Sequence, residues 1–205
     1  MDQLVFIGTG DAMGVPRVYC ECEVCGEARS SGVNRRYRSL VSVEGEEGSF
    51  LIDCGPDWRT GMERRGQRFA ERILVTHAHF DHIGGLPEWA DACRWLNRRG
   101  QLYAPREVLD MIVRQYPWLG GNLDMHAADD GITLGGWQIR GWKVFHGKTG
   151  FRTRTASRKT ASPGRTALIR SLCPRNSVPR CTVWICWCWA RALPGRGRIF
   201  HQIGI

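Results

Sequence analysis

An apolar run that ends directly in a cluster of metal-binding side chains constrains this chain more than any other feature. The stretch 73–85 reads Ile-Leu-Val-Thr-His-Ala-His-Phe-Asp-His-Ile-Gly-Gly, so a strand-type segment is followed by H-x-H-x-D-H. Imidazole and carboxylate groups are well suited to divalent metals. A lone histidine is usually a core or surface residue without a metal. Three histidines and an aspartate within six positions, directly after a strand, are seldom explained in that way. The stretch therefore predicts a metal site formed by His77, His79, Asp81 and His82.

Length and cysteine content indicate a single intracellular domain. The 205 residues, with a mass of 23.2 kDa, suffice for one domain with a substantial core. No apolar run approaches the roughly 20 residues of a membrane span, and the first apolar segment is too short for a signal peptide. We therefore expect a cytoplasmic protein that does not contact membranes. The nine cysteines are odd in number, which favours thiols or metal ligands over disulfides.

The charge of the chain is concentrated in its last quarter. The net charge is +9, yet residues 1–150 hold 18 Lys and Arg against 20 Asp and Glu. Residues 151–205 hold ten Arg, one Lys and no acidic residue. The chain thus consists of a near-neutral globular segment and a basic tail. The net charge alone is no argument for a nucleic-acid-binding protein.

The order of expected elements predicts an α/β fold. Strands outnumber helices and do not alternate with them strictly, which favours an α/β sandwich whose sheets pack together under outer helices. A loop over 18–25 carries Cys20, Cys22 and Cys25, and His126 is expected in a polar surface loop. Strands are predicted over 3–8, 39–43, 49–53, 72–76, 101–104, 132–134 and 137–145, and helices over 58–65, 87–96 and 105–115.

The motifs together resemble the metallo-β-lactamase fold hydrolases. The resemblance consists of Thr76–Gly85, the upstream Leu51-Ile-Asp-Cys-Gly55 and a strand-terminal His146-Gly147. The run Gly8-Thr-Gly-x-x-x-Gly-Val-Pro16, followed by C-x-C-x-x-C, is similar to the branch with the cyclic-phosphate phosphodiesterase of the carbon–phosphorus lyase pathway. The resemblance as a whole extends from residue 3 to about residue 150. The resemblance implies an αββα sandwich.

The resemblance also implies a ligand set for two divalent metals, Zn or Mn. His77, His79 and His146 would hold one ion, and Asp81 and His82 the other, with Asp81 also assigned to catalysis. Two metals about 3.5–4 Å apart can share a hydroxide that attacks phosphorus. For Asp53 we expect a place behind the ligands, where it orients a histidine. A capping or turn role is an equal alternative for Asp53.

The three clustered cysteines predict a second, structural metal site. Structural zinc takes four ligands, and Cys20, Cys22 and Cys25 supply three soft ones. The resemblance implies that a histidine near the C-terminus is the fourth. The alternative is three unrelated buried thiols. The charged surroundings of the loop argue against burial of the thiols and favour the metal site. This zinc would tie down the N-terminal loop without taking part in chemistry.

The tail departs from the family pattern. After His146 the family needs an aspartate that bridges the metals and a further histidine, but residues 151–205 contain no acid, and their one histidine, His201, lies in another context. Reading the codons of Trp184–Ala190 one base earlier replaces this Trp- and Cys-rich run with Asp, Leu or Met, Leu, Val, Leu and Gly, a strand-type sequence. We infer a frameshift near Gly150. The expected division is a domain over 1–150, with its sandwich incomplete on the C-terminal side, and an out-of-frame tail over 151–205 without native fold.

These observations favour a metal-dependent hydrolase whose partner is a small, cyclic phosphodiester. With ligands missing, we expect this chain to be weakly active or inactive. Other hydrolases of the same fold are alternatives: a ribonuclease-like enzyme, a thioesterase or a lactonase. Non-specific nucleic-acid binding through the tail and a zinc-stabilised interaction module are two further hypotheses. We expect no specific nucleic-acid partner, and a homodimer is left open.

Overall fold

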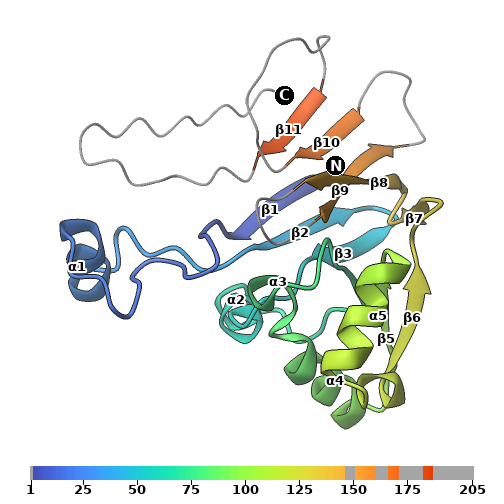
Figure 1. The fold of residues 1–205 in the computed structure, drawn as a ribbon, viewed down its shortest axis with the longest axis horizontal. Coiled ribbons are helices and arrows are strands. Elements are labelled where there is room, and N and C mark those ends of the chain that lie inside the picture. Colours follow the sequence, from blue (N-terminus) through green and yellow to red (C-terminus); the bar gives the residue numbers. More distant parts are fainter. Residues whose placement is uncertain (1, 146–150, 160–165, 171–181, 187–205) are drawn as a thin grey trace.

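The computed structural model describes residues 2–145, 151–159, 166–170 and 182–186, and its framework is two β-sheets (Figure 1). The first sheet has the strand order β1-β2-β3-β4-β5-β6. Its first three strands are antiparallel, and β3 to β6 are parallel. The strands are β1 (Gln3–Gly8), β2 (Leu40–Gly45), β3 (Gly48–Ile52), β4 (Arg72–Leu74), β5 (Gly100–Ala104) and β6 (Leu123–Ala127).

The second sheet has the order β11-β10-β9-β8-β7. Its strands are antiparallel except for the parallel pair β10 and β11. They are β7 (Ile132–Leu134), β8 (Trp137–Phe145), β9 (Phe151–Lys159), β10 (Thr166–Arg170) and β11 (Thr182–Cys186). The last three fall within the segment 151–205, whose lack of a native fold stays a prediction.

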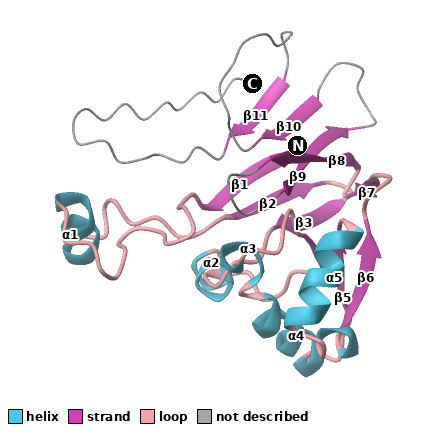
Figure 2. Ribbon diagram, viewed as in Figure 1, coloured by secondary structure: helices cyan, strands magenta, loops and turns pink. Residues whose placement is uncertain are grey.

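Helices cover one face of the first sheet (Figure 2). They are α2 (Trp58–Arg64), α3 (Phe80–Ile83), α4 (Leu86–Trp95), α5 (Arg106–Gln115) and the short 3-10 helix η1 (Leu119–Gly121). The helix α1 (Glu23–Ser30) instead lies apart from this layer, on an arm between β1 and β2 (Figure 1). Within the described part of the chain, no helix follows Gly121. The expected incompleteness of the sandwich stays a prediction.

Alternation along the strands divides the core into two clusters. Leu40 and Leu51 belong to the cluster between the first sheet and the helices, whereas Val41 and Phe50 belong to the cluster between the two sheets. Successive side chains of a strand point to opposite faces, so a strand buried on both faces reads as a continuous apolar run. The rest of the inter-sheet cluster comprises Val43, Ile52, Leu74, Leu134 and Ile139. The architecture is the mixed α/β sandwich that the sequence predicts.

The parallel pair β3 and β4 places the metal motif. Ile52 pairs with Leu74 at the carboxyl ends of these strands, and the backbone N–H of Asp53 donates to the carbonyl of Leu74 (2.8 Å). Side chains that follow neighbouring parallel strands emerge at the same edge of a sheet. Asp53 and the histidine motif, more than twenty residues apart in sequence, therefore meet at this edge.

Two expectations about local structure are wrong. Cys25 lies in helix α1 and not in a loop, and His126 lies on strand β6. The His126 ring stacks on Tyr103 of the adjacent strand, with ring centroids 4.7 Å apart, and its Nε2 lies 2.8 Å from Oε1 of Gln101. Both elements are short, so their local sequence signals are weak. No helix among the described residues is long and apolar enough to cross a membrane.

Candidate metal centre

The histidine motif forms a tight turn between β4 and α3. His77 follows the strand, His79 lies at the N-cap of α3, and Asp81 and His82 lie inside this helix. The His77 ring centroid lies 4.7 Å from that of His79 and 3.9 Å from that of His82. His77, Asp81 and His82 are buried. Three imidazoles and a carboxylate therefore share one small volume at the end of the sheet.

Asp53 holds this turn from behind. Its Oδ1 accepts hydrogen bonds from the backbone N–H (2.8 Å) and hydroxyl (2.8 Å) of Thr76, and its Oδ2 lies 2.6 Å from Nδ1 of His82. Asp53 is buried and has a φ of +65°, which a non-glycine residue rarely adopts. Strained backbone conformations of this kind persist where the surrounding structure holds the residue in place, and they are common at functional sites. This geometry would let Asp53 orient the His82 ring toward a metal.

The two carboxylates beside His82 determine its protonation. Burial of the imidazole opposes protonation, but the charges and hydrogen bonds of Asp53 and Asp81 outweigh it and raise the pKa of His82 to about 9. Oδ2 of Asp81 lies 3.0 Å from Nε2 of His82. Because Nδ1 faces Asp53, Nε2 is the nitrogen that His82 can offer to a metal.

Thr76 has a structural role that the sequence did not reveal. Its hydroxyl contacts both oxygens of Asp53, at 2.8 and 3.1 Å, and lies 3.0 Å from Nδ1 of His77. Thr76 thus connects the Asp53 carboxylate to a second ring of the motif. A β-branched hydroxyl residue immediately before the first histidine was the available signal, but its partner is 23 residues away.

Two glycines allow the loop after β3 to lie against the motif. A Cβ at Gly55 would lie 2.2 Å from the carbonyl oxygen of Asp81, and one at Gly85 would lie 2.4 Å from the carbonyl oxygen of Gly55. Backbone hydrogen bonds join the same segments: Cys54 N–H donates to His82 O (2.7 Å), and Gly85 N–H donates to Cys54 O (2.8 Å). Any side chain at these two positions would separate the loop from the metal motif.

The donor set fits divalent metals. Imidazole and carboxylate groups in contact, with a buried carboxylate behind one of the rings, form the usual environment of a protein-bound Zn or Mn ion. The structure brings His77, His79, Asp81 and His82 together and places Asp53 behind them. His146, the third expected ligand of the first metal, and His201 lie outside the described residues.

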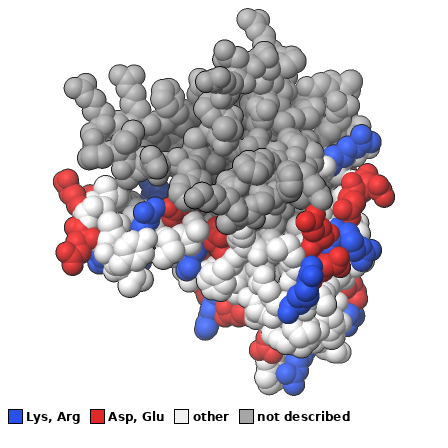
Figure 3. All heavy atoms as spheres, in the orientation of Figure 1, with Lys and Arg blue, Asp and Glu red and all other residues white. Residues whose placement is uncertain are grey.

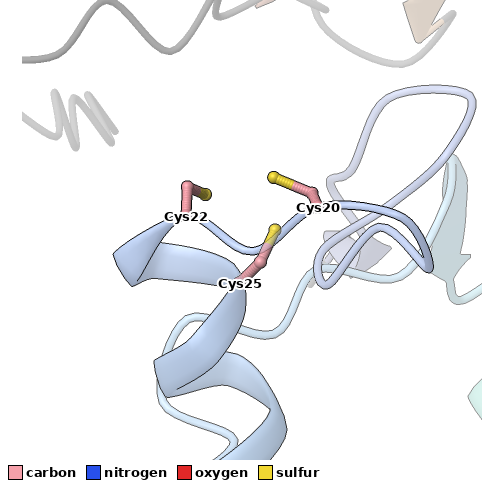
Figure 4. A group of neighbouring side chains, drawn as sticks. All are labelled: Cys20, Cys22 and Cys25. Atoms are coloured by element: carbon pink, nitrogen blue, oxygen red, sulfur yellow. The ribbon is translucent and has the colours of Figure 1, made fainter.

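The three cysteines also come together, on the arm that carries α1. Cys22 and Cys25 lie at the start of α1 and Cys20 on the loop before it, with the three sulfur atoms turned toward a common space (Figure 4). All three Sγ atoms lie within 4.8 Å of one another. Thiolates around a tetrahedral zinc ion, with Zn–S bonds of about 2.3 Å, are about 3.8 Å apart. The cluster therefore needs only small side-chain adjustments to hold such an ion.

The arm is arranged around these thiols. Nη2 of Arg29, in the last turn of α1, donates to the carbonyl oxygens of Arg17 (2.7 Å) and Val18 (3.3 Å), which holds the loop before Cys20 against the helix. The Cys25 backbone N–H lowers the pKa of the Cys22 thiol. For Cys20, the Cys22 backbone N–H lowers the pKa, but the neighbouring thiols outweigh it and the net shift is upward. The fourth ligand that the resemblance implies lies outside the described residues.

Burial of the cysteines differs from the expectation. The charged surroundings predicted exposed thiols, but Cys25 is buried and Cys20 is half-buried, whereas Cys22 is exposed. Cys25 lies with Ala28 on the buried face of helix α1. All five cysteines with described side chains are free thiols, and Cys54 and Cys93 lie deep in the helix-side core.

Comparison with solved structures finds a diphosphatase from the PhnP family. The match has a TM-score of 0.67 at 28% identity and covers 83% of this chain and 66% of the other. The zinc-bound PqqB from Methylobacterium extorquens matches with a TM-score of 0.66 over 86% of this chain and 67% of the other. Its identity of 19% indicates a shared fold only.

Comparison with curated sequences finds a ribonuclease Z of Bradyrhizobium diazoefficiens. It is 29% identical over 157 residues, which cover 69% of this chain and 52% of the relative. An octanoyltransferase of Porphyromonas gingivalis is 37% identical over 108 residues, which cover 53% of this chain. The chain thus spans about half of the first relative's length and 21% of the second's.

A family profile covers the region that contains the metal centre. The profile described as the metallo-beta-lactamase superfamily matches residues 34–152, more than half of the chain. This range begins before β2 and includes the loop after β3, the histidine motif and the expected ligand His146. The matched segment thus contains the buried imidazoles, the Asp53 carboxylate and the parallel strands that bring them together. The chain belongs to the metallo-β-lactamase superfamily.

Proposed function

We propose that this chain derives from a metal-dependent hydrolase that cleaves a small phosphodiester, with a cyclic phosphodiester as the substrate class. The observation that carries the proposal is the cluster of His77, His79, Asp81 and His82, all but His79 buried, which Asp53 holds at the carboxyl edge of the sheet. Two divalent cations bound there would lower the pKa of water toward about 7 and offset the charge of a phosphodiester. Zn and Mn both suit these ligands.

The roles of the side chains follow from their contacts. Asp53 and Thr76 orient the rings of His82 and His77, so that the donor atoms are in place before a metal arrives. Asp81, whose Oδ2 lies 3.0 Å from Nε2 of His82, would be a metal ligand and would also take part in catalysis. Burial excludes bulk water and strengthens each electrostatic interaction.

The relatives favour phosphorus chemistry over carbonyl chemistry. A diphosphatase and a ribonuclease, by their names, both act on phosphate compounds. The match to each of them covers more than two thirds of the present chain. The octanoyltransferase, by its name, transfers an acyl group, so an ester or thioester hydrolase is the alternative within this fold. A phosphodiester and a carboxyl ester differ in charge, which allows a direct test.

The activity of the chain depends on residues after Gly150. Because residues 151–205 include no acidic side chain, an aspartate that bridges two metals is not encoded there. We expect turnover of bis(p-nitrophenyl) phosphate by residues 1–205 to be weak or absent. A frame-corrected variant, with its reading shifted by one base after the Gly150 codon, should turn over this substrate readily with Zn or Mn. Comparable rates for the two proteins would refute the frameshift.

If p-nitrophenyl acetate is the only substrate that the corrected protein turns over, the assignment to phosphodiesters is wrong.

We also propose a structural zinc ion at the three cysteines, and no specific nucleic-acid partner. Acidic and basic side chains are interspersed over the described part of the face in Figure 3. The excess of positive charge belongs to the tail. Binding of nucleic acid through the tail should be independent of sequence and should fall steeply with salt. Sequence-selective binding in 0.2 M salt, measured by fluorescence anisotropy, would contradict this.

A further inference from the structure

The guanidinium of Arg38 is clamped on one edge by a carboxylate. Its Nε donates to Oδ2 of Asp57 (2.9 Å) and its Nη2 to Oδ1 (2.7 Å), while the Arg38 backbone N–H also donates to Oδ2 (2.8 Å). This fork holds the planar group in one orientation. Nη1, on the other edge, has no hydrogen-bond partner among the described residues. The Arg38 side chain is 26% exposed, so solvent reaches it.

The ion pair lies beside the metal motif. Gly55, two residues before Asp57, lies against the Asp81 carbonyl, and its Cβ position is 3.7 Å from the carbonyl oxygen of Ser39. The residue next to Arg38 and the backbone of Asp81 therefore flank the same glycine. The hydrogen bonds that Arg38 donates to Asp57 raise the pKa of Arg38, burial lowers it, and the charges of Asp57 and Asp81 raise it further. The charge of Asp81 thus adds to that of Asp57 in favouring the charged guanidinium.

A second ion pair also joins the region of β2 to an end of α2, so it serves as a comparison for the Arg38–Asp57 pair. Nη2 of Arg65, just after α2, lies 2.6 Å from Oε1 of Glu44 on β2, and the Arg65 side chain has the same 26% exposure. Glu44 is six residues from Arg38, about 20 Å along an extended chain. Both pairs join the β2 region to an end of α2. Of the two arginines, only Arg38 lies at the end of β2 that is next to the metal motif.

We propose that Arg38 binds an anionic phosphate oxygen of the substrate, with Asp57 as the positioning residue. The inference rests on the proposed function and extends it to substrate selection. A phosphodiester carries a negative charge on its non-bridging oxygens, to which the remaining guanidinium edge can donate. A neutral carboxyl ester offers no such charge. Arg38 therefore selects phosphodiesters over esters at the same metal centre.

Isothermal titration calorimetry of inorganic phosphate with the zinc-loaded chain 1–205 tests this directly. Arg38→Gln should weaken phosphate binding about tenfold or more, the effect of losing one charge-assisted hydrogen bond. The matched variant Arg65→Gln should bind within about twofold of the unmodified chain, because Arg65 lies away from the metal motif. Equal affinities in all three proteins would overturn the inference, as would an equal loss in both variants. Failure of the unmodified chain to bind phosphate would also overturn it.

Two further variants keep the test valid if Arg38→Gln does not fold. Arg38→Lys keeps the charge without the fork and should bind phosphate with intermediate affinity. Asp57→Asn leaves the guanidinium unclamped and should weaken binding less than the loss of Arg38. Affinities for both that equal that of the unmodified chain would count against the inference. Thermal unfolding of all variants identifies effects of stability alone.

Kinetics of the frame-corrected protein distinguish this inference from the proposed function. Arg38→Gln should raise the KM for bis(p-nitrophenyl) phosphate and leave hydrolysis of p-nitrophenyl acetate unchanged. Phosphate binding that needs Arg38 without any phosphodiester turnover would refute the function and support the phosphate site. Phosphodiester turnover that is insensitive to Arg38 would refute the phosphate site and leave the function standing.

Discussion

The two clusters of metal-type ligands in this chain differ in almost every physical respect. The histidine centre is buried at the end of two central strands, and a carboxylate stands behind it. The cysteine cluster lies on an arm, is half exposed, and consists of thiols at most five residues apart in the sequence. The first brings together residues from distant parts of the sequence, whereas the second is local. Preorganisation by the fold suits catalysis, and local closure by a metal suits a structural role.

The largest expected effect separates the two sites completely. His77→Ala should abolish metal binding at the histidine centre and leave metal at the cysteines, because the two ligand sets share no residue. Metal content of the purified chain, measured by mass spectrometry, should fall accordingly. The matched control is His126→Ala, which removes a half-buried histidine from β6 without touching the centre. If both variants lose the same amount of metal, the histidine centre is not the site.

A smaller effect is expected at Asp53. Asp53→Asn should lower metal affinity at the histidine centre about 10- to 100-fold, the usual cost of losing the carboxylate behind a ligand histidine. Asparagine tolerates the positive φ of this position, so the backbone should stay intact. Competition with a fluorescent zinc chelator measures the affinity. Unchanged zinc affinity would mean that Asp53 serves only the turn, the alternative that the sequence left open.

The cysteine cluster should affect stability and not catalysis. Cys22→Ser removes an exposed sulfur ligand, and the arm should lose its metal because three ligands no longer converge. The thermal unfolding midpoint should fall in the presence of zinc. After treatment with EDTA, the variant and the unmodified chain should unfold at the same temperature. A Cys22→Ser variant that unfolds at a lower temperature even without metal would indicate packing of the thiols and no zinc site.

The smallest effect is expected from the hydroxyl of Thr76. Thr76→Val keeps the shape of the side chain but removes the hydrogen bonds to Asp53 and His77, which should cost about 2 kcal/mol of unfolding free energy. Thr76→Ser retains the hydroxyl and should lose much less. Urea unfolding of the metal-free chain measures both. Equal losses in the two variants would show that the methyl group, and not the hydroxyl, is what matters.

Sequence alone predicted the elements whose signals are local. The apolar run before His77, the helical spacing near Trp89 and the three clustered cysteines each lie within a dozen residues, and the structure contains all three. The helix α1 and the strand β6 were missed because both are short. The alternation of apolar and polar residues in β6 covers only five residues, so the strand becomes evident only from its pairing with β5.

The sequence by itself determined the kind of chemistry, because imidazole and carboxylate donors at this density have few other uses. It also determined the family and the alternation that separates the two core clusters. Only the tertiary structure decided that Asp53 faces His82, 29 residues away, and that Asp57 clamps Arg38, 19 residues away. These contacts depend on the parallel pairing of β3 with β4 and on the turn into α2. No local sequence pattern predicts these two contacts, because they form only when the strands are side by side.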